Sequence, residues 1–176
     1  MRAARFLEVP DIYEPDLDSY NRLEEFMDSF SQLDDLAIRY GFSDLAVHGN
    51  FRTIQVMTAL GLTKDSSRRA DALDQNGHMV EIKTCDITKS NSFSTATELT
   101  SEKCRRFRTF MWTFGVFVGL RLREVYVMDP RYLEPLFLHF EAKIEKSKTG
   151  FIRNPSIPVS YVIKHGTKKF ENTNSQ

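Results

Sequence analysis

Apolar side chains recur at spacings of three and four residues between residues 17 and 40. This period is typical of one face of an amphipathic α-helix. The stripe consists of Leu17, Tyr20, Leu23, Phe26, Met27, Phe30, Leu33, Ala37 and Tyr40. Asp16 or Asp18 can cap the start of this helix, and Gly41 is expected to end it. The stripe packs either in the core or against a second subunit.

Two further segments predict helices. Residues 52–60 have a helical pattern that stops at Gly61. Asp129-Pro130 is a helix-start signal, so we expect a helix that has an irregularity at Pro135 and continues to about Lys146.

The strand predictions rest on apolar, β-prone segments. Residues 111–120 and 122–128 predict two strands, the first of them central in a sheet. Residues 159–163 predict a short strand near the end of the chain. By contrast, residues 86–100 are rich in Ser, Thr and Asn, with Phe93 as the only aromatic residue, and predict a loop outside the core.

Basic residues gather in two places. Ser101 can cap a helix whose basic face consists of Lys103, Arg105, Arg106 and Arg108. This face either contacts phosphates or is simply solvated. Residues 164–169, Lys-His-Gly-Thr-Lys-Lys, predict a loop whose cations and backbone amides suit phosphate, and the alternative is an ordinary soluble turn. The tail after Phe170 is expected to fray.

The strongest turn signal is Asn76-Gly77, which lies between two short runs of mixed apolar and polar residues. In a three-residue loop the glycine takes the positive-φ position of a bulge turn. In that register Asp74 pairs with His78, and Asp71 faces Glu81. Two carboxylates therefore oppose each other across the hairpin.

Glu81 and Lys83 lie two residues apart on one strand and project to the same face, while Val80 and Ile82 project to the other. Facing acids repel, so their arrangement favours a divalent cation between them, and oxygen ligands with open water positions suit Mg²⁺. Lys83 then orients water and offsets negative charge at phosphorus. The alternative is a solvated hairpin, because this spacing also arises by chance.

Composition indicates one globular domain, since the chain has 176 residues of which 41% are hydrophobic. The N-terminus has no apolar run, which predicts a cytoplasmic location. Cys85 and Cys104 lack metal-ligand spacing and are interpreted as buried free thiols, with no zinc site.

The net charge is zero, but it is segregated along the chain. Residues 1–35 hold ten acids and three bases, a charge of minus seven, and residues 36–176 balance this with plus seven. A basic body suits a polyanion, and an acidic arm suits self-association. The alternative is solvated charge on two faces.

Short motifs occur in one order along residues 36–170. They are Tyr40-Gly41, Gln55-Val56, Gly61-Leu62-Thr63, Asp71-Ala72-Leu73-Asp74, Gly77, Glu81-Ile82-Lys83, Ile87-Thr88-Lys89, Phe93-Ser94-Thr95, Trp112, Asn154-Pro155, Ile157-Pro158-Val159, Tyr161-Val162 and His165-Gly166-Thr167-Lys168. In this series the chain resembles the PvuII-type restriction endonucleases of the PD-(D/E)xK nuclease superfamily.

The resemblance implies an α/β fold with a restriction-endonuclease-like mixed β-sheet flanked by helices. It implies one nuclease domain over residues 1–176, in which residues 1–40 are a helical dimerisation arm, residues 41–170 the catalytic and DNA-binding body, and residues 171–176 a frayed tail.

The implied activity is that of a prokaryotic Type II restriction endonuclease. A homodimer hydrolyses palindromic duplex DNA with Mg²⁺, leaves 5′-phosphate ends, and works beside a cognate DNA methyltransferase. Asp71 and Glu81 fall on the family's metal-binding acids and Lys83 on its catalytic lysine, and the backbone carbonyl of Ile82 joins the metal shell.

The departures from the family lie where DNA sequence is read. Ala96-Thr97-Glu98 replaces a run of three histidines, Phe107 replaces a tyrosine near the active site, and Arg68 replaces a glutamate beside the catalytic acids. Glu98 either accepts from a cytosine amino group or pairs with an arginine. The DNA-binding candidates are His48, Ser94, Thr95, Thr97, Glu98, Arg153, Asn154, His165 and Lys168. We therefore expect retained chemistry and a different target sequence.

Two other functions fit the same features. One is a repair or recombination nuclease of this fold that recognises DNA structure, and the other is a dimer that holds DNA without cutting it.

Overall fold

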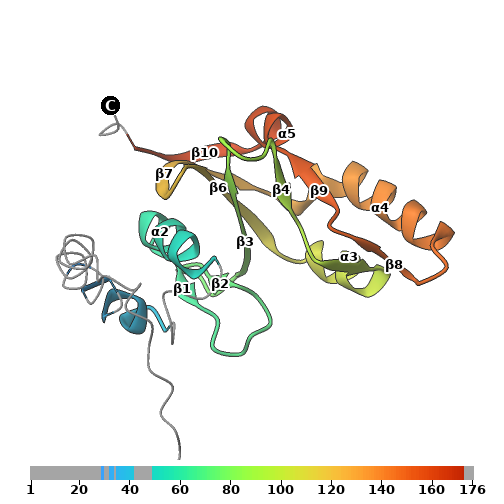
Figure 1. Cartoon of the computed structure of the whole chain (residues 1–176). Helices are drawn as coiled ribbons and strands as arrows, with labels where there is room; N and C mark the ends of the chain where they lie inside the picture. The colour runs from blue at the N-terminus through green and yellow to red at the C-terminus, as the bar shows by residue number, and fades with distance from the viewer. Residues whose placement is uncertain (1–28, 30–31, 34, 42–48, 173–176) are drawn as a thin grey trace, which may run out of the picture.

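A six-stranded mixed sheet forms the centre of the protein in the computed structural model, which describes residues 29, 32–33, 35–41 and 49–172 (Figure 1). Its strands, in spatial order, are β1 (Thr63–Lys64), β2 (Ala72–Leu73), β3 (Met79–Asp86), β6 (Met111–Val118), β7 (Arg121–Met128) and β10 (Thr167–Glu171). Strands β3 and β6 are parallel, and all other neighbours are antiparallel. The predicted mixed α/β class and the central position of residues 111–118 are confirmed.

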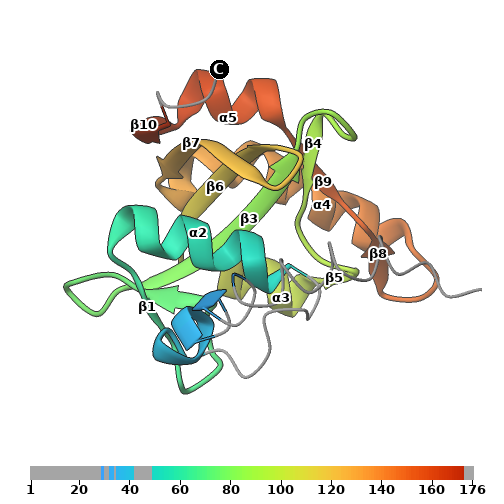
Figure 2. The same ribbon diagram turned by 60° about the vertical axis from the view of Figure 1, so that its left-hand side comes forward.

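Helix α2 (Asn50–Leu60) covers one face of this sheet (Figure 2). The helix ends as predicted at Gly61, whose φ of 63° lets its backbone N–H bond the last turn. Helix α2 also lies very close to β6. A Cβ at Gly115 in β6 would lie only 2.5 Å from Cγ2 of Val56 in the helix. Glycine at this position allows the helix to contact the sheet closely.

The opposite face is covered by α3 (Ser101–Phe107), the 3₁₀ turn η1 (Pro130–Leu133), α4 (Glu134–Lys146) and α5 (Val159–His165). Trp112 and Phe114 project from β6 into this layer, where Trp112 packs against Phe137 of α4. The carboxylate of Asp129 accepts from the backbone N–H of Arg131, which confirms the predicted helix start.

Residues 86–100 were predicted to be a loop outside the core, and that prediction is wrong. They contain β4 (Ser92–Ser94), which pairs with β9 (Ser156–Pro158), and β5 (Glu98–Thr100), which pairs with β8 (Phe151–Arg153). Phe93 and Leu99 are fully buried. Because each strand has three residues, only its central side chain enters the core, and one apolar residue among hydroxyl side chains gives no visible period.

The C-terminal predictions also need correction. Residues 159–163 form the start of helix α5 rather than a strand, because the chain leaves β9 at Pro158 and Val162 becomes the buried position of a helical turn. The predicted loop at residues 164–169 supplies the end of α5 and the start of β10. The frayed tail was placed too early, since Asn172 still bonds the carbonyls of Arg123 and Leu122.

Of the predicted N-terminal helix, only residues 29, 32–33 and 35–40 lie among the described residues. Residues 35–39 are helical, Ala37 is fully buried, and Gly41 ends the helix with a φ of 80°. The proposed caps Asp16 and Asp18 and most of the apolar stripe lie outside the described residues. In α3, Thr100 rather than Ser101 is the cap, because its hydroxyl accepts from the Lys103 N–H.

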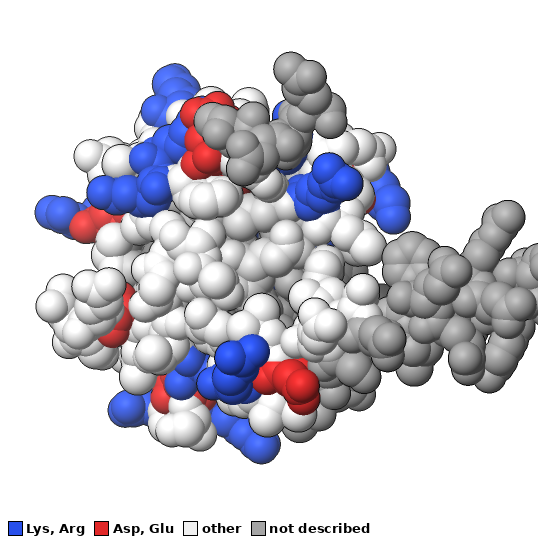
Figure 3. Space-filling view, turned by 90° about the vertical axis from the view of Figure 1, so that its left-hand side faces the viewer, with Lys and Arg blue, Asp and Glu red and all other residues white. Residues whose placement is uncertain are grey.

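Lysine and arginine side chains lie mainly toward the margin of the face that Figure 3 shows, and its centre is largely uncharged. Cys85 and Cys104 are buried free thiols as predicted, and burial raises the pKa of both. No helix in the described ranges is long and apolar enough to cross a membrane.

Candidate active site

The hairpin between β2 and β3 has the register that the sequence predicted. Ala72 pairs with Val80, and the N–H of Asp74 donates to the carbonyl of His78 at 3.0 Å. Gly77 has a φ of 80° and closes the turn. Continuing this register by one residue places Asp71 opposite Glu81.

Three charged residues meet at this point. Nζ of Lys83 donates to Oε1 of Glu81 at 2.7 Å, and Oδ2 of Asp71 accepts from the backbone N–H of Ile82 at 2.8 Å. The side chains of Val80 and Ile82 are buried on the other face, beneath α2. The predicted division of charged and apolar faces along β3 is therefore confirmed.

Glu81 is an unusual residue for this position because only 8% of its surface is exposed. Burial raises the pKa of its carboxyl group, and the nearby charge of Asp71 acts in the same direction, while Lys83 and Arg106 oppose them. Anything that adds positive charge between the two acids will favour the ionised form of Glu81. A divalent cation does this most effectively.

The donor atoms fit a hard cation that keeps several waters. Asp71 has one carboxylate oxygen bound to the Ile82 N–H, and the second carboxylate comes from Glu81. Among the described residues, no three His, Cys, Asp or Glu side chains gather in one metal-binding group. Two carboxylates completed by backbone carbonyl, water and phosphate oxygens suit Mg²⁺, which is seldom held by protein side chains alone.

An aromatic wall lies beside Lys83. Its Nζ is 5.9 Å from the centre of the Phe107 ring, which packs edge-on against Trp112 at 5.0 Å. The indole N–H of Trp112 donates to the Phe107 carbonyl and fixes the wall. From the sequence, Phe107 is only a replacement for a family tyrosine near the active site, and Arg106 is only part of a basic face.

That basic face is smaller than predicted. The guanidinium of Arg108 donates to the carboxylate of Glu134 and to that of Glu141. These bonds join α3 to α4 and raise the pKa of Arg108. Arg108 is therefore occupied within the fold, and the expectation that it faces phosphates is wrong. Arg105 and Arg106 remain exposed.

Two short ribbons, β4 with β9 and β5 with β8, bring most of the predicted DNA-reading residues together. Ser94 pairs with Ser156, Glu98 pairs with Arg153, and the N–H of Asn154 donates to the Thr97 carbonyl. The Arg153 guanidinium lies 3.8 Å from the Glu98 carboxylate, and both side chains are largely exposed. This contact fits the second of the two predicted roles of Glu98, and its exposed carboxylate is also accessible to a base.

Thr95 and His165 do not join this group. Thr95 is buried, and its hydroxyl donates to the Pro155 carbonyl at 2.8 Å, so it holds the two ribbons together. The His165 ring packs against the Tyr161 ring at a tilt of 39°, with 4.4 Å between their centres. His48 lies outside the described residues.

Lys168 lies on β10, at the far edge of the sheet. It is in one cross-strand row with Lys83, through Phe114 and Tyr126, and three strand spacings place the two lysines about 14 Å apart. Its Nζ bonds Glu124 at 2.6 Å, and this bond raises its pKa. The structure does not bring Lys168 to the three-charge cluster.

The structure has a mixed sheet with two facing acids and a lysine beside a central strand. This arrangement indicates a nuclease, an enzyme that hydrolyses phosphodiesters. The comparison with known families is specific within this class. A family model described as restriction endonuclease PvuII matches residues 18–170, which is most of the chain. The chain therefore belongs to the PvuII restriction endonuclease family. It is a Type II site-specific deoxyribonuclease, and restriction endonucleases of this kind are typically metal-dependent.

Proposed function

We propose that the protein cleaves a short palindromic DNA duplex in a Mg²⁺-dependent reaction, with Asp71, Glu81 and Lys83 as its catalytic residues. The observation that carries the proposal is the convergence of these three side chains at the first half of β3. When bound there, Mg²⁺ polarises a phosphoryl oxygen and lowers the pKa of a water ligand.

Each residue has a distinct role. The carboxylates of Asp71 and Glu81, with the Ile82 carbonyl, hold the cation, and the raised pKa of Glu81 falls as its charge is compensated. Lys83 orients the attacking water and offsets the charge that develops at phosphorus. The water oxygen bonds phosphorus as the bond to the 3′ oxygen breaks, and the products are a 5′-phosphate and a 3′-hydroxyl.

Recognition is assigned to the ribbons. Ser94, Thr97, Glu98, Arg153 and Asn154 share one exposed surface formed by β4, β5, β8 and β9. Carboxylate, amide and guanidinium groups are the side chains that distinguish base pairs in the major groove. Since Ala96-Thr97-Glu98 replaces the family's run of three histidines, we expect a target sequence of this chain's own.

A palindromic target requires a two-fold symmetric enzyme, so the active form is proposed to be a homodimer assembled through residues 1–40. Each subunit then has a restriction-endonuclease fold with a helical arm. The dimer acts in the bacterial cytoplasm. A cognate methyltransferase protects the host genome.

The test is incubation of phage and plasmid DNA with the purified protein, with and without Mg²⁺, followed by sequencing of the fragment ends. Lys83→Ala is the inactive control. We expect discrete Mg²⁺-dependent fragments that share one palindrome. Cleavage at branched or damaged DNA without a common sequence would contradict the proposal, and so would full activity of Lys83→Ala.

A further inference from the structure

The two ribbons are parts of one longer antiparallel ribbon that is irregular in its middle. Figure 2 shows β4 and β9 side by side, with β5 and β8 below them. Between the two sets of pairs, residues 95–97 on one strand lie opposite residues 154–155 on the other, so three residues face two. An extra residue of this kind makes a β-bulge, which bends a ribbon and redirects its side chains. We call residues 95–97 and 154–155 the ribbon junction.

Hydrogen bonds close the ribbon junction across this irregularity. The backbone N–H and the hydroxyl of Thr95 both donate to the carbonyl of Pro155, at 2.9 and 2.8 Å. The N–H of Asn154 donates to the carbonyl of Thr97 at 3.1 Å. Thr95 is only 3% exposed, and Pro155 is buried. Because a proline has no N–H to donate, Pro155 is held at this point by the two donors of Thr95.

Asn154 has a backbone conformation that is uncommon on two counts. Its φ of 45° lies in the left-handed region, and it directly precedes a proline, where the chain is normally extended. The bonds at Thr97 and at Pro155 hold the backbone on either side of it. Residues kept in sparsely populated conformations are concentrated at functional sites, where the surrounding contacts maintain the strain. The conformation of Asn154 therefore indicates a side chain that has been placed for binding.

The ribbon junction also changes which side chains face the solvent. A regular strand exposes every second side chain. Thr97 and Glu98 are consecutive on one strand, and both are exposed. Arg153 and Asn154 are consecutive on the other strand, and both are exposed as well. The irregularity thus exposes all four of these candidate base-reading residues, whereas an uninterrupted ribbon would turn one of each pair toward the core.

We propose that Thr95 is a positioning residue for base recognition. Its bonds to Pro155 fix the ribbon junction and thereby orient the Asn154 side chain toward a base edge. Thr95 is itself buried and does not contact DNA. The inference rests on the proposed function, which places the ribbons against the DNA. A substitution can remove the Thr95 hydroxyl, and the remaining backbone bond to Pro155 then keeps the two strands together.

The test measures the base preference of Thr95→Val, which keeps the shape of the side chain and removes the hydroxyl. The probe is a duplex library in which the wild-type cleavage site, found by sequencing of fragment ends, is randomised. We expect the preference at one base-pair position of each half-site to fall by about 5- to 10-fold, the net contribution of one hydrogen bond. Asn154→Ala should lose preference at the same position, and the double variant should lose no more there than Asn154→Ala does.

Two variants are matched controls. Thr95→Ser keeps the hydroxyl and is expected to keep the wild-type preference. Thr113→Val makes the same change at a buried threonine of β6, away from the ribbons, and is expected to leave the preference unchanged. Urea denaturation establishes whether each variant is folded. If Thr95→Val does not fold, Thr95→Cys takes its place with the same expectation, because a thiol is a poor hydrogen-bond donor.

Three results would overturn the inference. They are a wild-type preference in the folded variant that lacks the hydroxyl, a similar loss in Thr95→Ser, and losses that add in the double variant with Asn154→Ala. An equal loss at all positions would also contradict it, since a purely structural role weakens every contact alike. Failure of the proposed function gives a different result, because the wild-type protein would then have no common cleavage site.

Discussion

Strand β3 and the two ribbons differ in how they hold their functional side chains. On β3, Glu81 is buried, is bonded by Lys83, and lies between strands on both sides. On the ribbons, Glu98 and Arg153 are exposed and separated by 3.8 Å. A buried site with fixed neighbours tolerates few changes, whereas an exposed pair on short strands can be replaced without unfolding the protein. This difference predicts that substitutions on the ribbons can change the target sequence while the chemistry at β3 is kept.

The largest expected effect comes from Glu81→Gln, which keeps the shape of the side chain and removes its charge. We expect cleavage to fall by about 10²- to 10³-fold, because one of the two anionic ligands for the cation is lost. Duplex binding without divalent cations should not weaken, since a negative charge leaves the DNA-facing site. Glu102→Gln, an exposed acid on α3, is the matched control for both assays.

The next effect is on stability rather than chemistry. Gly115→Ala places a methyl group 2.5 Å from Cγ2 of Val56 and forces α2 away from the sheet. We expect the free energy of unfolding to fall by about 1–3 kcal/mol, which is the usual cost of overpacking. Urea denaturation measures this. Gly150→Ala has open space around it but a φ of 72°, so its smaller loss reports backbone strain alone.

A change in the ribbons should alter selectivity and leave the sheet intact. Replacing Arg153 and Glu98 by Gln, singly and together, is expected to reduce discrimination at one base-pair position by about tenfold, within the ~1–3 kcal/mol of a bidentate base contact. Sequencing of the cleaved ends from a randomised library gives the preference at every position. Equal losses at all positions would indicate that the pair contacts phosphate instead.

The sequence was most informative where local signals were strong. Asn76-Gly77 fixed the hairpin register, and through it the pairing of Asp71 with Glu81, because a one-residue shift would move the acids to opposite faces. The parallel pairing of β3 with β6 is set by tertiary contacts, and no short motif reports it. The same limit applies to the ribbons, whose paired residues are 51 to 66 positions apart along the chain.

The sequence predicted only part of the candidate site, because it shows which residues share a strand but not which elements pack together. Glu81 and Lys83 share a strand, so the spacing alone places them on one face. Arg106 and Phe107 come from α3, which meets β3 only in the folded protein. Residues 159–163 were assigned to a strand because β-branched residues dominate them, and the Pro158 cap and the packing of Val162 overrode that propensity.

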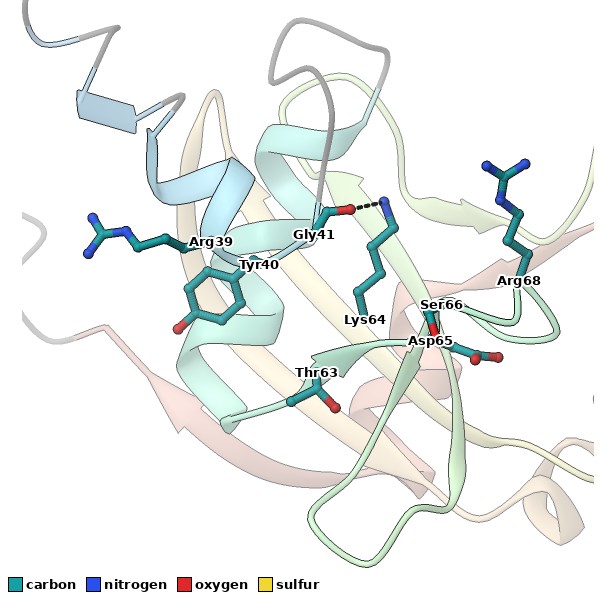
Figure 4. A pocket seen from close by; sticks show the side chains of 8 residues that line it. All are labelled: Arg39, Tyr40, Gly41, Thr63, Lys64, Asp65, Ser66 and Arg68. Carbon is teal, nitrogen blue, oxygen red and sulfur yellow. Dashed lines mark hydrogen bonds between the residues drawn. The ribbon is translucent and has the colours of Figure 1, made fainter.

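The smallest expected effect concerns the loop that follows β1 (Figure 4), and it depends on pH. Hydrogen bonds to Ser67 and the following backbone lower the pKa of Asp65 from 3.8 to about 2. Because the folded protein favours the charged form, Asp65 stabilises the fold fully above about pH 4, and this contribution is lost as the pH falls through about 2. The difference in unfolding free energy between wild type and Asp65→Asn should therefore shrink over this range. Glu102→Gln, which alters an exposed acid, should show no such trend, and a constant difference for Asp65→Asn would assign its role to packing rather than to charge.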